Sequence, residues 1–181
     1  MNTSSRFVVG VHVLALLTAR RFAPPASGEM LMSSEELAES VNTNPVVIRR
    51  ILSQLQQADL VITHSGRNGG SELARPPEKI NLREVYEATE PGLLFHLHYS
   101  DPDPFCPVGA YIEDTLSDVF AAAREALKCE LEKRTLHQVA VEVMERAGLL
   151  ELVRAGASFE ELRELVQEHM KNRAEGRRLA F

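Results

Sequence analysis

Two neighbouring arginines, Arg49 and Arg50, carry the most specific chemistry in this chain of 181 residues. An arginine side chain can donate two hydrogen bonds to the edge of a guanine, or it can clamp a phosphate. Neighbouring residues of a helix point about 100° apart, so we expect at least one of the two to face a bound nucleic acid. The alternative is a pair of solvated arginines on a surface helix.

The residues just before these arginines could complete a reading surface. Asn44 can cap a helix, and Pro45 suits the first helical position, where no amide hydrogen is needed. Thr43 stands at the same entrance, and capping alone would account for both Thr43 and Asn44. Val46 and Val47 could meet a thymine methyl group, or they could pack against the preceding helix.

A helix-turn-helix would position all of these side chains. Ser33 can cap a first helix that reaches Val41, because the carboxylate of Glu36 can return to the cap from three residues on. A second helix from Pro45 would turn one apolar stripe inward, formed by Ile48, Ile51, Leu52 and Leu55. A strand over 60–63 and a glycine-rich turn over 65–70 then predict a hairpin.

These elements together predict a winged helix-turn-helix. The expected fold is mainly α with a small β wing, and a long dimerisation helix follows it. The second helix would enter the major groove of double-stranded DNA. The residues we expect to contact DNA are Arg6, Ser34, Thr43, Asn44, Val46, Val47, Arg49, Arg50, Ser65, Arg67 and Asn68.

The net charge of −6 is unevenly distributed along the chain. Residues 1–80 hold eight Lys/Arg against seven Asp/Glu, and residues 81–181 hold twelve against nineteen. Affinity for DNA depends on local phosphate contacts rather than on the charge of the whole chain. An acidic second half is therefore compatible with a basic reading face, and it predicts modest nonspecific binding.

The composition favours a cytoplasmic protein without a membrane segment. The apolar run 7–17 is interrupted by His12 and is too short to span a bilayer. Only Cys106 and Cys129 are present, so no disulfide scaffold is implied. The chain lacks the nucleotide-binding, hydrolase and zinc-protease motifs, and we expect no enzymatic activity.

The expected organisation has four parts. Residues 1–90 form the winged helix-turn-helix domain, which begins with a helix from Arg6 to about Ala19. Residues 91–107 are an irregular linker or sensor loop, 108–147 hold the dimerisation helices, and 148–181 form a C-terminal helical extension. In the first helix we expect a mostly buried face of Phe7, Val8, Val11, Leu14, Ala15 and Leu17. In a last helix over 158–170 we expect an apolar face of Phe159, Leu162, Leu165 and Val166.

A long helix from about Val108 to Lys133 carries the expected dimer contact. Its apolar residues recur at intervals of three and four, close to a heptad seam. They are Ile112, Leu116, Val119, Ala123 and Leu127. We therefore expect a homodimer; the alternative is that this stripe packs back on its own domain.

Several stretches resemble the Rrf-type winged-helix transcription regulators, the group that contains IscR and NsrR. They are 5–7 with His12, 41–50, Asn68-Gly69-Gly70, 82–86, Phe95-His96-Leu97-His98 and Cys106-Pro107-Val108-Gly109. The last two are most similar to the cluster-free YwnA-type branch. The resemblance covers about residues 5–147 and implies a DNA-binding regulator. Cluster-binding members carry three closely spaced cysteines before the long helix, whereas this chain has Cys106 alone there, so we expect no iron–sulphur cluster and no other cofactor.

His96, His98 and Cys106 form the one group that resembles a metal site. No fourth firm ligand accompanies them, so we expect packing rather than metal binding. Cys106 stands near the start of the long helix, where the helix dipole can lower the pKa of a thiol. It is either a redox thiol or a structural cysteine.

The function we expect is sequence-specific transcriptional regulation by a homodimer on a pseudo-palindromic operator. We expect a repressor, and its activity could respond to a redox signal or to a ligand. The alternative is a winged-helix module that binds another protein, because folds of this class do both. The sequence identifies no small-molecule effector.

Overall fold

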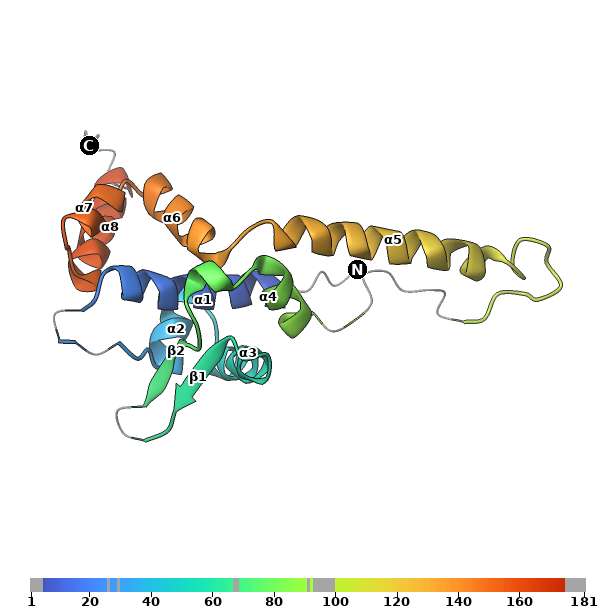
Figure 1. The fold of residues 1–181 in the computed structure, drawn as a ribbon, viewed down its shortest axis with the longest axis horizontal. Coiled ribbons are helices and arrows are strands. Elements are labelled where there is room, and N and C mark those ends of the chain that lie inside the picture. The colour runs from blue at the N-terminus through green and yellow to red at the C-terminus, as the bar shows by residue number, and fades with distance from the viewer. Residues whose placement is uncertain are drawn as a thin grey trace.

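The computed structural model describes residues 5–25, 27–28, 30–66, 69–90, 92 and 100–174. Within them the fold is mainly helical with one small antiparallel sheet, as the sequence predicts (Figure 1). In chain order the elements are α1 (Arg6–Phe22), α2 (Ser34–Val41), α3 (Pro45–Gln57), β1 (Val61–His64), β2 (Gly70–Leu73), a 3₁₀ turn η1 (Pro77–Lys79), α4 (Leu82–Thr89), α5 (Ile112–Glu132), α6 (Leu136–Arg146), α7 (Leu150–Arg154) and α8 (Phe159–Ala174). No helix of the described residues is long and apolar enough to cross a membrane.

Local capping sets the two helices of the helix-turn-helix. The Glu36 N–H donates to Ser33 Oγ at 3.2 Å, and the Ser33 N–H donates to Glu36 Oε2 at 2.8 Å. Asn42 then ends α2 in the left-handed conformation, with φ 55°. The Val46 N–H donates to Asn44 Oδ1 at 2.8 Å, and Pro45 occupies the first turn. Both predicted helix starts are confirmed.

Helix α1 lies in the middle of the domain and packs against α2, α3, α4 and α6 (Figure 1). Gly10 allows α4 to approach α1 closely, because a Cβ there would come within 2.9 Å of the Thr89 side chain. The side chains that α3 contributes to this core are the four predicted ones, Ile48, Ile51, Leu52 and Leu55. The core therefore joins the reading helix rigidly to α1.

The predicted hairpin is present as an antiparallel pair, with Val61 opposite Leu73 and His64 opposite Gly70. A bridge between Met32 and Ser71 adds the segment before α2 to this sheet. Gly70 permits that contact, since a Cβ at this position would lie 2.9 Å from the Met32 carbonyl oxygen. The wing is thus fastened to the entrance of α2.

Helix α5 extends away from the domain (Figure 1). It begins at Ile112 rather than at the predicted Val108, because the preceding residues form separate turns: the Cys106 N–H donates to the Asp103 carbonyl, and the Tyr111 N–H to the Val108 carbonyl. Near its other end α5 is tied to α4 by two ion pairs, Arg83–Glu132 and Lys128–Glu87, both at 3.0 Å. No residue of α5 is buried within the described chain.

The C-terminal extension folds back on the end of α1. Leu162 of α8 is buried in a small apolar cluster with Ala19, Ala23, Met144 and Leu149. Leu165 and Val166, predicted on the same apolar face, lie outside this cluster and are 41% and 39% exposed. Helix α7 was not predicted, since five residues between Gly148 and Gly156 show too little periodicity.

Replacing Leu162 by alanine should therefore lower the free energy of unfolding by about 2–5 kcal/mol, since the change leaves a cavity in a packed cluster. Leu165→Ala, one turn further along α8, removes the same atoms from an exposed site and should cost less than about 1 kcal/mol. Urea unfolding followed by circular dichroism measures both. Equal, small effects would show that α8 does not pack on α1.

Candidate nucleic-acid interface

The outward face of α3 lies opposite its buried stripe. Counted at about 100° per residue, Val46, Arg50, Ser53 and Gln57 follow this face from one end of the helix to the other, and all four are exposed. Ser53 and Gln57 were not among the predicted contacts. The sequence already indicated them, because Ser53 lies three residues after Arg50 and Gln57 four residues after Ser53, which places both on the helix face opposite the apolar stripe.

Arg49 points sideways from this face, toward α2. Its Nη2 lies 2.5 Å from Glu35 Oε1, and its Nε donates to Ser34 Oγ at 3.1 Å. The Ser34 hydroxyl in turn donates to Glu35 Oε2 at 3.0 Å. Hydrogen bonds from Ser34, from the backbone and from Arg49 lower the pKa of Glu35, so its carboxylate is charged at neutral pH.

The entrance of α3 joins these side chains into one surface. Thr43 is half-buried and Asn44 is exposed in the turn between the two helices. Val47 is 38% exposed and Val46 is 49% exposed, so part of each side chain is accessible to a bound molecule. The structure therefore brings together seven of the predicted contacts at the corner of α2 and α3, namely Ser34, Thr43, Asn44, Val46, Val47, Arg49 and Arg50.

The remaining predicted contacts lie elsewhere. Ser65 is exposed just after β1. Arg67 and Asn68, at the wing tip, lie outside the described residues. Arg6 forms an ion pair with Glu90, at 3.0 Å, that joins the start of α1 to the end of α4.

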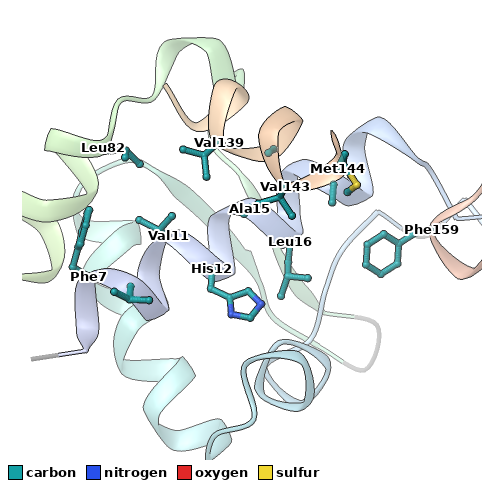
Figure 2. Close-up of a pocket in the computed structure, with 13 residues that line it drawn as sticks. Phe7, Val11, His12, Ala15, Leu16, Leu82, Val139, Val143, Met144 and Phe159 are labelled. Carbon is teal, nitrogen blue, oxygen red and sulfur yellow. The ribbon is translucent and has the colours of Figure 1, made fainter. Parts of the chain in front are cut away.

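An apolar groove of about 540 Å³ runs along α1 and α6 (Figure 2). The prediction that Val8 is buried is wrong: Val8 lines this groove and is 66% exposed, and Val143 of α6 is 51% exposed. Phe159 of the C-terminal extension forms part of the wall. His12 contributes the polar side chain; partial burial lowers its pKa, and its Nε2 lies 3.4 Å from Ser40 Oγ of α2. The neutral imidazole thus connects the groove to the helix-turn-helix.

The predicted dimer stripe is only partly covered: one of its five residues is exposed and four are half-buried. Val119 is 57% exposed, and none of its companions is buried. They are Ile112, Leu116, Ala123 and Leu127. Within the described residues, the apolar face of α5 is therefore only partly buried.

Cys106 lies in the turns before α5, and its side chain is exposed. Hydrogen bonds from the backbone N–H groups of Gly109 and Val108 lower the pKa of its thiol. Cys129, also exposed, lies about 25 Å along α5 from the start of that helix. Among the described residues no three His, Cys, Asp or Glu side chains gather as metal ligands. The other members of the predicted metal group, His96 and His98, lie outside the described residues.

Several of the known proteins that this chain resembles are transcriptional regulators. A model of the Rrf2 family, described as an iron-dependent transcriptional regulator, matches residues 3–142. The HTH-type transcriptional regulator YwnA of Bacillus subtilis is 37% identical over 136 residues, which make up 75% of this chain and 95% of YwnA. The HTH-type regulator Rv1287 of Mycobacterium tuberculosis is 32% identical over 127 residues, 66% of this chain and 72% of its own. A transcriptional regulator from Lactobacillus plantarum has a similar structure, with TM-score 0.64 and 27% identity, over 83% of this chain and 97% of that one.

Proposed function

The chain belongs to the Rrf2 family of transcriptional regulators, and we propose that it acts as a homodimeric repressor on a pseudo-palindromic operator. The observation that carries the proposal is the incompletely covered apolar stripe on α5, none of whose residues is buried. A two-fold dimer would place two copies of α3 in successive major grooves, about 34–36 Å apart. Both half-sites would then carry the same bases in opposite orientation.

The dimer would cover two apolar surfaces of each chain. The stripe on α5 supplies one, and the groove along α1 and α6 supplies the other, with Val8 and Val143 on its rim. An exposed apolar patch of this kind typically marks a contact with another molecule. In this proposal a second copy of α5 lies against the first, and the groove holds further side chains of the partner.

Repression follows from occupancy. A dimer bound across a promoter excludes the polymerase without any further chemistry, and no activating surface is required. Selecting genomic fragments that the purified protein retains would identify the operator. Transcription from a promoter overlapping the enriched motif should fall as protein is added in a purified system; transcription that rises or stays level would refute repression.

An iron–sulphur cluster does not fit the residues of this chain. Such clusters are held by several thiolates, and here the only two cysteines are Cys106 and Cys129. Cys129 lies well along α5, whereas Cys106 lies before that helix begins. We therefore propose that the protein regulates transcription without a cluster, so the purified protein should lack the visible absorption of iron–sulphur centres.

Cys106 offers a redox switch in place of a cluster. Its thiolate can attack a small disulfide, forming a mixed disulfide and releasing the other half as a thiolate. The product would add bulk in the turns that precede the helix that sets the half-site spacing. In this proposal the modification changes the distance between the two reading helices and hence the affinity for the operator.

Leu116→Glu and Val119→Glu should each dissociate the dimer at micromolar concentration, because a dimer would bury the new carboxylate without a partner. Ala121→Glu is the matched control: it introduces the same charge on the opposite side of α5 and should leave the dimer intact. Light scattering gives the mass, and circular dichroism checks helicity. If all three variants keep the wild-type mass, the stripe is not the interface.

Cys106 should react with a small disulfide reagent faster than an ordinary thiol, since its lowered pKa leaves more thiolate at neutral pH. The rate of this fast reaction should decrease as the pH falls through the pKa of Cys106, because the thiolate is then protonated. The fast reaction should be absent in Cys106→Ser, which retains Cys129. Operator affinity should change on oxidation of the wild type and recover on reduction. If wild type and Cys106→Ser respond alike, Cys106 is not the switch.

A further inference from the structure

The two neighbouring arginines of α3 occupy different environments. Arg49 is bound to Glu35 and Ser34 of α2, as described above. Arg50 lies on the outward line of α3, and within the described residues it forms no ion pair or hydrogen bond. One guanidinium is therefore already engaged by a carboxylate before DNA arrives, and the other is available.

We propose that Arg50 reads a base edge, whereas Arg49 contacts a phosphate for which Glu35 competes. The inference deepens the assignment of α3 as the reading helix and rests on DNA binding by that helix. It gives Glu35, a residue outside the predicted contacts, a role in limiting the affinity for DNA of any sequence. Glu35 acts on DNA through Arg49 and is a positioning residue.

The position of Arg50 suits base readout. It shares the face of α3 opposite the core with Val46 and Ser53, and this face is the one that a helix turns to the floor of the major groove. A free guanidinium there can donate two hydrogen bonds to one guanine. Arg49 lies about 100° away around the helix, on the side of α2. When α3 lies in the major groove, this side faces the phosphates at the edge of the groove.

Glu35 makes phosphate contact less favourable. Its carboxylate is held by Ser34 as well as by Arg49, and it is charged at neutral pH. A phosphate that approaches Arg49 must share or displace this carboxylate, and it meets a like charge nearby. The penalty applies to every DNA sequence, so it lowers all affinities by the same factor and keeps binding to random DNA weak. Discrimination between sequences then comes from Arg50 and its base contact.

The closing experiment compares Glu35→Gln with Glu39→Gln. Both residues lie on α2 and are exposed, but Glu39 pairs with Arg163 of α8, at 3.0 Å, rather than with an arginine of α3. Each variant is titrated against a duplex with one selected half-site and against a scrambled duplex, over a salt series. Single half-sites make the result independent of dimerisation and of repression.

Glu35→Gln should raise affinity for the scrambled duplex at least threefold and make its salt dependence steeper, because Arg49 then neutralises a phosphate more fully. Glu39→Gln should change both affinities less than twofold. Arg49→Ala should weaken both duplexes by a similar factor and make the salt dependence shallower. If Glu35→Gln behaves like Glu39→Gln, Glu35 does not compete with phosphate and the proposal fails.

Arg50 is tested by base preference rather than by affinity alone. Arg50→Lys keeps the charge but loses the planar pair of donors. It should reduce discrimination at one base pair of the half-site about tenfold while keeping the wild-type salt dependence, and Arg50→Ala should reduce both. Wild-type preference in Arg50→Lys, or loss of preference in Arg49→Ala instead, would overturn the assignment. Unfolding midpoints confirm that each variant is folded.

Discussion

The fold depends on the burial of one helix, α1, between the other elements of the domain. Helices α2 and α3 pack on it, α4 approaches it closely at Gly10, and α6 lies along it. Because protein cores are close-packed, these elements cannot move independently without opening voids. The orientation of the reading helix is therefore tied to α6 and to the C-terminal extension, whose cluster includes Ala19 and Ala23.

The C-terminal extension packs against α1, whereas α5 extends away from it. Helix α8 buries Leu162 against the end of α1 and adds Phe159 to the groove. Helix α5 extends beyond α1 and is held to α4 by ion pairs between partly exposed side chains, which contribute little to stability. A helix with so little cover gains most from a second chain, which is the physical basis of the proposed dimer.

Charge acts locally in this molecule. The chain is acidic overall, yet the corner of α2 and α3 exposes one engaged and one available arginine. In the proposed mechanism this corner holds both Arg49, which attracts a phosphate, and Glu35, which competes with that phosphate. Discrimination between DNA sequences then comes from geometry around individual guanidinium groups rather than from net charge.

Elements with local signals could be predicted from the sequence alone. The caps at Ser33 and Asn44 depend on hydrogen bonds that span two or three residues, and the apolar stripe of α3 depends on one helix period. These patterns also carried the family resemblance. They predicted the winged helix-turn-helix and most of its reading corner.

Only the tertiary structure decided which faces are covered. Val8, Leu165 and Val166 are as apolar as their buried neighbours, and nothing local distinguishes them. The start of α5 depended on turns that return to Asp103, and the difference between Arg49 and Arg50 depended on Glu35, fourteen residues from Arg49 along the chain. Contacts between distant segments settle such questions, because burial and pairing are properties of the assembled chain and not of its local periodicity.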